Sequence, residues 1–244
     1  MGIKRITFIL LAIGMAFLQA ACSGKKDIPD SVLWINGTHA VLTKINNGDV
    51  NLFGTMADNA INKAAIRKSL ADSWGVTTRQ EMDDMIDSLV IGRHNPQFLE
   101  KAGEYGITEM SRGEFEKELK TVDDRELVIF FRNMFDAYQA FGEKAILGWD
   151  LSRATQLCAY GYIAGFYTYD EAVDKALPIG RKIQNDFASW DDFFASYMYG
   201  YLYWSEDDID DPKSDYAQRV KILQDLKADK KSPLNLAWRL DLSK

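Results

Sequence analysis

Four hydroxyl residues in this chain are each followed, three positions later, by an acidic residue, and helix-compatible sequence continues from there. In such a pair the hydroxyl accepts a hydrogen bond from the backbone N–H at the third helical position, and the carboxylate accepts one from the backbone N–H of the hydroxyl residue. The acidic side chain also lies favourably in the first turn. One match proves little, but four predict a predominantly helical protein. The pairs are Thr78 with Glu81, Ser111 with Glu114, Thr168 with Glu171, and Ser189 with Asp192.

Apolar residues at spacings of three and four indicate the same fold class, most clearly over residues 123–144. No long linker, composition shift or internal repeat divides residues 31–244. We therefore predict an all-α fold, a single compact multi-helix domain of about eight to ten helices with short loops. Gly37 weakens the first helix, Gly148 is expected to mark a joint, and Pro178 is a candidate kink. The expected helical segments are 31–46, 56–74, Thr78 to Gly92, a short one from Pro96, one from Ser111, 123–144, 149–165, 168–187, 189–204 and 214–227.

One of these segments has a competing interpretation as a strand, because Tyr197, Tyr199, Tyr201 and Tyr203 alternate. The helical interpretation is preferred for two reasons. The segment begins with the Ser189 cap, and its other large aromatic residues share a helical face with Tyr197 and Tyr201.

The N-terminus has the pattern of an export signal. Lys4 and Arg5 precede an apolar run over residues 6–17, and small residues lead to Cys22. The run is shorter than the ~20 residues of an ordinary transmembrane helix. It resembles a bacterial lipoprotein signal, although Gln19 replaces the usual aliphatic residue. We expect residues 1–21 to be a signal peptide, Cys22 to carry lipid, and residues 22–30 to form a polar tether. An uncleaved anchor and plain secretion are the alternatives.

The charge balance limits the classes of partner. The chain has a net charge of −7, which becomes −9 when the signal peptide and its two basic residues are removed. An acidic domain of this kind is not expected to bind nucleic acid. Cys22 and Cys158 are the only cysteines, so lipidation of Cys22 leaves no partner for a disulfide, and Cys158 is expected to be a core residue.

Familiar catalytic motifs are missing from the sequence. It has no phosphate-binding glycine loop, nucleophile elbow, zinc-binding helix or paired cysteine motif, and its only histidines are His39 and His94. No metal and no cofactor are therefore predicted, and an enzyme is the less favoured reading. The acidic run over residues 206–211 is interpreted as a solvated loop in preference to a cation site.

Asp150 and Arg153 are the most informative charged residues, because they lie within an apolar segment. Their spacing of three places them on one helix face, where they can form an ion pair. Three interpretations stay open: a structural pair, a ligand or partner site, and catalysis. The candidate site consists of Asp150, Arg153, Trp149, Trp190 and Tyr162.

The same residues carry a resemblance to a known family. The segments Gly148 to Arg153, Tyr160 to Gly165, Glu171-Ala172, Ser189-Trp190 and Gly200 to Trp204 resemble the motifs of the DUF1266 family of bacterial proteins of unknown function. Trp74-Gly75, Gly92 with His94, and Ser232-Pro233 with Trp238 are similar to further motifs of that family, although Arg93 separates the glycine from the histidine and Leu234 replaces a usual tryptophan. The resemblance implies a helical domain and no established activity.

From these features we expect a lipid-anchored protein of the bacterial envelope, with the outer membrane or cell surface favoured. Its expected role is a helical module that binds another macromolecule, most simply a protein. The alternative is a small-ligand receptor or enzyme that uses a pocket around Asp150 and Arg153.

Overall fold

The computed structural model describes residues 28–205, 207 and 209–243. Over these residues the chain forms eleven α-helices, two short 3₁₀ helices and no strand, which confirms the all-α prediction with one helix more than expected. The α-helices are α1 (Asp30–Thr38), α2 (Ala40–Ile45), α3 (Ala60–Trp74), α4 (Arg79–Val90), α5 (Asn95–Glu104), α6 (Arg112–Leu119), α7 (Arg125–Phe141), α8 (Leu147–Ala164), α9 (Tyr169–Asp186), α10 (Trp190–Ser205) and α11 (Asp215–Ala228). The 3₁₀ helices are η1 (Gly142–Lys144) and η2 (Pro233–Asn235).

The predicted capping pairs begin four of these helices. Thr78, Ser111 and Thr168 form complete capping boxes with their acidic partners at the starts of α4, α6 and α9. At the start of α10 the Ser189 hydroxyl accepts from the Asp192 N–H at 3.1 Å, while the Asp192 carboxylate accepts from the N–H of Ala188. The tyrosine-rich segment that competed as a strand is therefore the helix α10.

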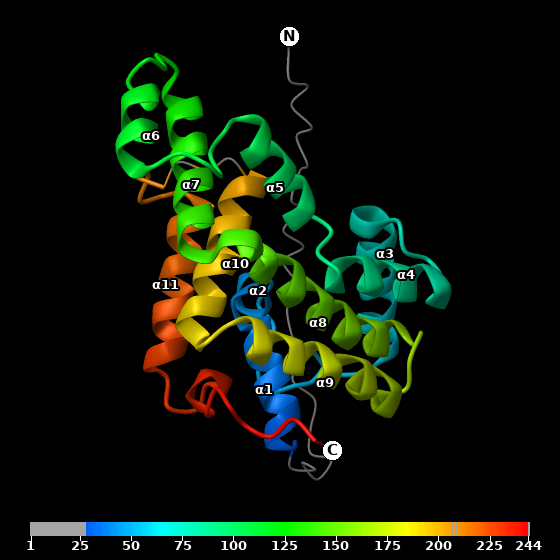
Figure 1. Cartoon of the computed structure of the whole chain (residues 1–244). Coiled ribbons are helices and arrows are strands. Elements are labelled where there is room, and N and C mark those ends of the chain that lie inside the picture. The colour runs from blue at the N-terminus through cyan, green and yellow to red at the C-terminus, as the bar shows by residue number, and fades with distance from the viewer. Residues whose placement is uncertain (1–27, 206, 208, 244) are drawn as a thin grey trace.

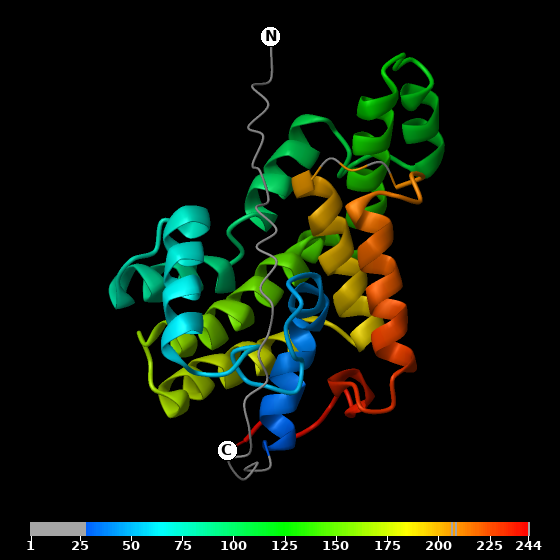
Figure 2. The same cartoon turned by 180° about the vertical axis from the view of Figure 1, so that it is seen from behind.

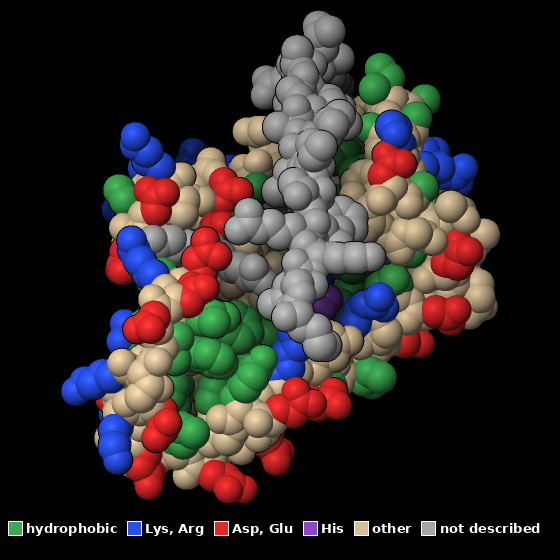
Figure 3. All heavy atoms as spheres, turned by 90° about the horizontal axis from the view of Figure 1, so that it is seen from above, with side chains coloured by type: hydrophobic (Ala, Val, Ile, Leu, Met, Phe, Trp, Pro, Cys, Tyr) green, Lys and Arg blue, Asp and Glu red, His purple; other side chains and the backbone are tan. Residues whose placement is uncertain are grey.

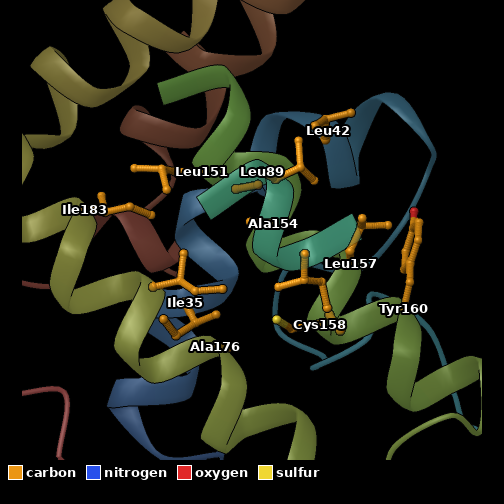
Figure 4. Packing of buried hydrophobic residues seen from close by; sticks show 14 of the residues in the cluster. Ile35, Leu42, Leu89, Leu151, Ala154, Leu157, Cys158, Tyr160, Ala176 and Ile183 are labelled. Carbon is orange, nitrogen blue, oxygen red and sulfur yellow. The ribbon is translucent and has the colours of Figure 1, made fainter. Parts of the chain in front are cut away.

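Helix α8 is the centre of the domain and is covered on all sides. Sixteen of its 18 residues are buried, and it packs against α10, α9, α4, α3 and α1 (Figure 1). Leu151, Ala154, Leu157 and Cys158 of α8 belong to one buried cluster with Ile35 of α1 and Ala176 and Ile183 of α9, and Leu151 lies beside Ile183 (Figure 4). A helix buried on every face needs neighbours on every face, which explains why so many helices surround it. Burial raises the pKa of the Cys158 thiol to about 12, as expected for a core residue.

A second, smaller cluster of buried residues lies among α5, α6 and α7. Phe98, Phe115 and Phe135 belong to it, and the rings of Phe115 and Phe135 stack at 4.1 Å. Seen from behind, α1 lies in front of α8 and α9, and the C-terminal segment passes close to α1 (Figure 2). From above, acidic and basic side chains are interspersed and hydrophobic side chains gather in one area (Figure 3).

The structure corrects two details of the prediction. The segment 31–46 forms two helices that break at His39, two residues after Gly37. Gly148 is no joint: it lies in the first turn of α8, where an added Cβ would approach the carbonyl oxygen of Phe193 to 2.7 Å. The chain turns instead at Gly142, whose φ of 56° suits glycine. Pro178, the candidate kink, lies inside the continuous helix α9.

The predicted signal peptide and Cys22 lie outside the described residues, as do positions 206 and 208 of the acidic run. Within the described part of the chain, no helix combines the length and the apolar character needed to cross a membrane.

Candidate functional site

Asp150 lies in the first turn of α8 and is fully buried. Its carboxylate accepts hydrogen bonds from the backbone N–H groups of His94 and Asn95 at 2.9 and 3.0 Å, and from Nδ1 of the His94 ring at 2.5 Å. The two backbone donors belong to the start of α5, which has no cap from its own N-cap side chain. Asp150 therefore caps α5 from another helix, and its charge faces the positive end of that helix.

The loop that carries His94 is tied to the start of α8 by further bonds. Asn95 Oδ1 accepts from the N–H of Ile146 at 2.9 Å, and Asn95 Nδ2 donates to the carbonyl of Glu143 at 2.7 Å. Gly92 has a φ of 91°, a conformation that side chains other than glycine's rarely adopt, so the chain can turn into this loop. The His94 side chain is 25% exposed, and the bond to Asp150 fixes its ring orientation.

Arg153 does not form the ion pair that its spacing from Asp150 predicted. Its guanidinium lies instead among three indole rings, with Cζ 3.9 Å from the ring centroid of Trp149, 5.4 Å from that of Trp74 and 5.8 Å from that of Trp204. No acidic side chain among the described residues forms a salt bridge with it. Its Nε is sealed from solvent and has no hydrogen-bond partner in that part of the chain.

The environment of Arg153 does not fully compensate its charge. Burial lowers the pKa of the guanidinium to about 10, so the group is still charged at neutral pH. Removing a cation from water costs several kcal/mol, whereas the closest cation–π contact, with Trp149, contributes about 0.5–2 kcal/mol and the two longer ones contribute less each. The balance therefore favours an arginine that has an anionic partner, and the described residues provide none in contact.

A shallow hollow of about 220 Å³ opens next to Arg153 and its three indole rings. Trp74 lines it and also faces Arg153, so the hollow and the arginine share one aromatic wall. Trp204 is 45% exposed and flanks Arg153 from α10. The site is therefore accessible on the side of Trp74 and Trp204. The remaining lining residues are Gly75, Val76, Glu81, Asp84, Met85, Ser88 and Arg93, so the hollow itself carries charges of both signs.

Two residues of the predicted site lie elsewhere. Trp190, at the start of α10, packs against Trp34 and Trp238 and donates from Nε1 to the carbonyl of Leu236. Tyr162, near the end of α8, packs against Phe53 and Tyr169. The structure thus brings together only Trp149, Asp150 and Arg153 of the five. No group of three or more His, Cys, Asp or Glu side chains suited to a metal ion occurs among the described residues.

Residues from five separate stretches of sequence meet at this site, and four of these residues were missing from the predicted set. His94, Trp74 and Trp204 were recognisable only through their family motifs, because nothing in their local spacing connects them to α8. Arg219, described below, had no sequence signal at all. The motif residues that converge are Trp74, His94, Trp149, Asp150, Arg153 and Trp204.

Comparison with known proteins gives a family. The sequence model of a family described as a protein of unknown function (DUF1266) matches residues 69–239, well over half of the chain. A curated relative, the uncharacterized protein YbeU of Escherichia coli (strain K12), is 25% identical over 145 residues, which are 59% of this chain and 60% of the relative. The chain thus matches less than two thirds of that relative's length. No solved structure matches the chain significantly.

Proposed function

We propose that this chain, which belongs to the DUF1266 family, is an exported, lipid-tethered module that binds an anionic group of another macromolecule at Arg153. One observation carries the proposal: the guanidinium is enclosed by three indoles and has no acidic partner among the described residues. A planar guanidinium is weakly hydrated and can hold a carboxylate or phosphate through two parallel hydrogen bonds. Tryptophan and arginine are also the residue types that contribute most to binding at protein interfaces.

Asp150 and His94 support this role by holding the site in place. Because Asp150 fixes the start of α5 to the first turn of α8, it also positions the turn of α8 that carries Trp149 and Arg153. A site on rigid, mutually bonded helices keeps its geometry when a ligand arrives. The acidic net charge limits binding of polyanions, so the expected partner presents one local anionic group.

A small-ligand receptor or enzyme is the second candidate function. Its support is the His94 ring, which Asp150 orients in the way a carboxylate orients a general base. However, His94 makes no hydrogen bond to a serine, threonine or cysteine in the described part of the chain. A binding role therefore requires fewer additional groups than a hydrolytic one.

The lipid tether is proposed from the sequence of the N-terminal segment. The basic start, the apolar run and the Ala20-Ala21-Cys22 end support attachment to the envelope through a lipid on Cys22, with the outer membrane or surface favoured. In a bacterial expression host, Cys22→Ala should abolish fatty-acid labelling and release the domain from the membrane fraction. Unchanged labelling would refute the tether and leave the binding site untouched.

The binding role is tested by cross-linking in intact cells followed by affinity capture. Wild type should recover a reproducible partner, and Trp204→Ala should lose most of it. The matched control is Tyr105→Ala, since Tyr105 has almost the same exposure, 46% against 45%, but its ring packs against Phe131 and not against Arg153. Equal recovery by both variants would contradict the assignment of the site. Turnover of a small substrate without any captured partner would favour the second candidate.

A further inference from the structure

A second arginine lies in the same aromatic cluster. Arg219 of α11 is only 5% exposed, and its Cζ lies 3.8 Å from the ring centroid of Tyr201. Its Nη1 donates to the carbonyl of Asp215, one turn earlier in its own helix. Its Nε, like that of Arg153, is buried and has no hydrogen-bond partner among the described residues. A buried arginine with neither an ion pair nor a full set of acceptors is unusual.

The two arginines are connected through aromatic rings. The Trp149 ring contacts Arg153 on one side, and its centroid lies 5.3 Å from that of Tyr197 and 5.9 Å from that of Tyr201. Tyr201 in turn contacts Arg219. Four buried polar atoms of this cluster have no hydrogen-bond partner in the described part of the chain: Trp149 Nε1, Arg153 Nε, Arg219 Nε and Tyr197 Oη. All four can donate a hydrogen bond, whereas buried donors in proteins normally have acceptors.

The pKa shifts of Arg153 and Tyr197 agree with the closeness of these two residues to Arg219. Burial lowers the pKa of Arg153, and the charge of Arg219 acts in the same direction, whereas Tyr197 and Asp150 oppose the decrease. Burial raises the pKa of Tyr197, and the charges of Arg219 and Arg153, together with the approach of the Arg219 guanidinium to the Tyr197 hydroxyl, oppose that rise. Tyr197 therefore lies within the fields of both cations.

Two acidic residues close to the cluster, Asp150 and Asp207, are engaged elsewhere. Asp150 faces the start of α5, as described above. Asp207 accepts from the Tyr201 hydroxyl at 2.8 Å and from the N–H of Tyr216 at 3.0 Å. Neither forms a salt bridge with an arginine of the cluster. The cluster thus contains two cations and four buried hydrogen-bond donor atoms. The described residues supply no carboxylate to pair with the cations.

We infer that Arg153 and Arg219 together bind one doubly charged oxyanion of the phosphate class, with Tyr197 and Trp149 donating to the same group. This inference rests on the proposed function and specifies its ligand chemistry. Two guanidinium groups match a dianion better than the single charge of a carboxylate, and the oxygens of a phosphate accept enough bonds for four donors. The half-buried Arg153 and the exposed Trp204 are the more accessible members of the cluster and form its entrance, whereas Arg219 is the more deeply buried arginine.

The test is calorimetric titration of the full chain, purified in detergent, at pH 7.5 and constant ionic strength in chloride. The probes are inorganic phosphate, phenyl phosphate and acetate. Both phosphates should bind at least tenfold more tightly than acetate. Tighter binding of phenyl phosphate than of inorganic phosphate identifies a phosphoryl group carried by a larger ligand, and the reverse order identifies the free ion. Equal binding of acetate and both phosphates would overturn the assignment to a doubly charged group.

Variants separate the pair of arginines from Arg153 alone. Arg219→Gln and Arg153→Gln should each weaken phosphate binding at least tenfold. Arg112→Gln should not weaken it, because Arg112 also lies over an aromatic ring, 4.6 Å from the centroid of Phe135, but is paired with Asp136 at 2.6 Å. Tyr197→Phe removes only a hydroxyl, so it should weaken binding severalfold even if Arg219→Gln does not fold.

The outcomes distinguish this inference from the proposed function. If Arg219→Gln and Tyr197→Phe bind like wild type while Arg153→Gln does not, the paired site is wrong and a site at Arg153 alone is supported. If Arg153→Gln also binds like wild type, the inference and the proposed site at Arg153 both fail.

Discussion

Asp150 and His94 are 56 residues apart in the sequence, yet a hydrogen bond joins Oδ1 of the one to Nδ1 of the other. The second oxygen of Asp150 accepts from the first backbone amides of α5. One carboxylate on the central helix therefore determines where α5 begins and how the His94 ring lies. This contact assigns Asp150 to the structure of the site and leaves Arg153 as the charged group available to a ligand.

Asp150→Asn should destabilise the protein by about 2–4 kcal/mol. It removes the charge that faces the helix end and leaves buried donors poorly matched. His94→Gln retains both backbone bonds to Asp150 and should cost only about 1 kcal/mol. Guanidinium unfolding followed by circular dichroism measures both values. Equal losses for the two variants would show that the ring contact, and not the helix cap, carries the stability.

His39 should make the protein less stable in mild acid. It is 1% exposed, its Nε2 has no partner among the described residues, and burial lowers its pKa from 6.5 to about 4. Because the unfolded chain takes up the proton first, the contribution is complete above pH 6.5 and is lost as the pH falls toward 4. The shift corresponds to about 3 kcal/mol.

The measurement is the free energy of unfolding of wild type and His39→Gln between pH 7 and pH 4. Carboxylates that titrate in this range are common to both proteins, so their effects cancel in the difference. The variant should lose less stability than wild type over this range. Parallel curves would contradict the assignment.

Gly200 should be intolerant of a side chain because it allows α10 to approach α8. A Cβ added there would overlap the Cβ of Trp149. Gly200→Ala should therefore destabilise by about 1–3 kcal/mol through overpacking. The control is Gly103→Ala in α5, where nothing lies within 4 Å of the added Cβ and higher helix propensity should stabilise by about 0.5–1 kcal/mol. Thermal unfolding of both variants compares them directly, and similar shifts would exclude a close contact at Gly200.

Local signals made most of the fold predictable. A hydroxyl and an acidic residue three positions apart satisfy a helix start without help from distant residues, so the starts of α4, α6 and α9 were predicted correctly. The same locality explains one error. Gly37 suggested only a weakened helix, whereas the break falls at His39, which packs into the core.

The candidate site was predictable only in part because long-range contacts determine it. A spacing of three suggested that Asp150 would pair with Arg153, but the unsatisfied amides of α5 compete for the carboxylate, and no local pattern reveals them. Trp74 and Trp204 reach Arg153 from α3 and α10. Their family motifs were visible in the sequence, but their meeting point depends on how those helices pack against α8.

The most direct test of the account is the free energy of unfolding of Arg153→Met. Methionine retains apolar contact with the three indoles and removes a partly buried charge whose desolvation costs several kcal/mol. The close contact with Trp149 returns about 2 kcal/mol at most, and the two longer cation–π contacts return less each. If Arg153 is present to hold a ligand, the variant should be as stable as wild type or more stable by about 1–2 kcal/mol. A loss of more than about 2 kcal/mol would contradict the account, because it would make Arg153 a stabilising residue of the core.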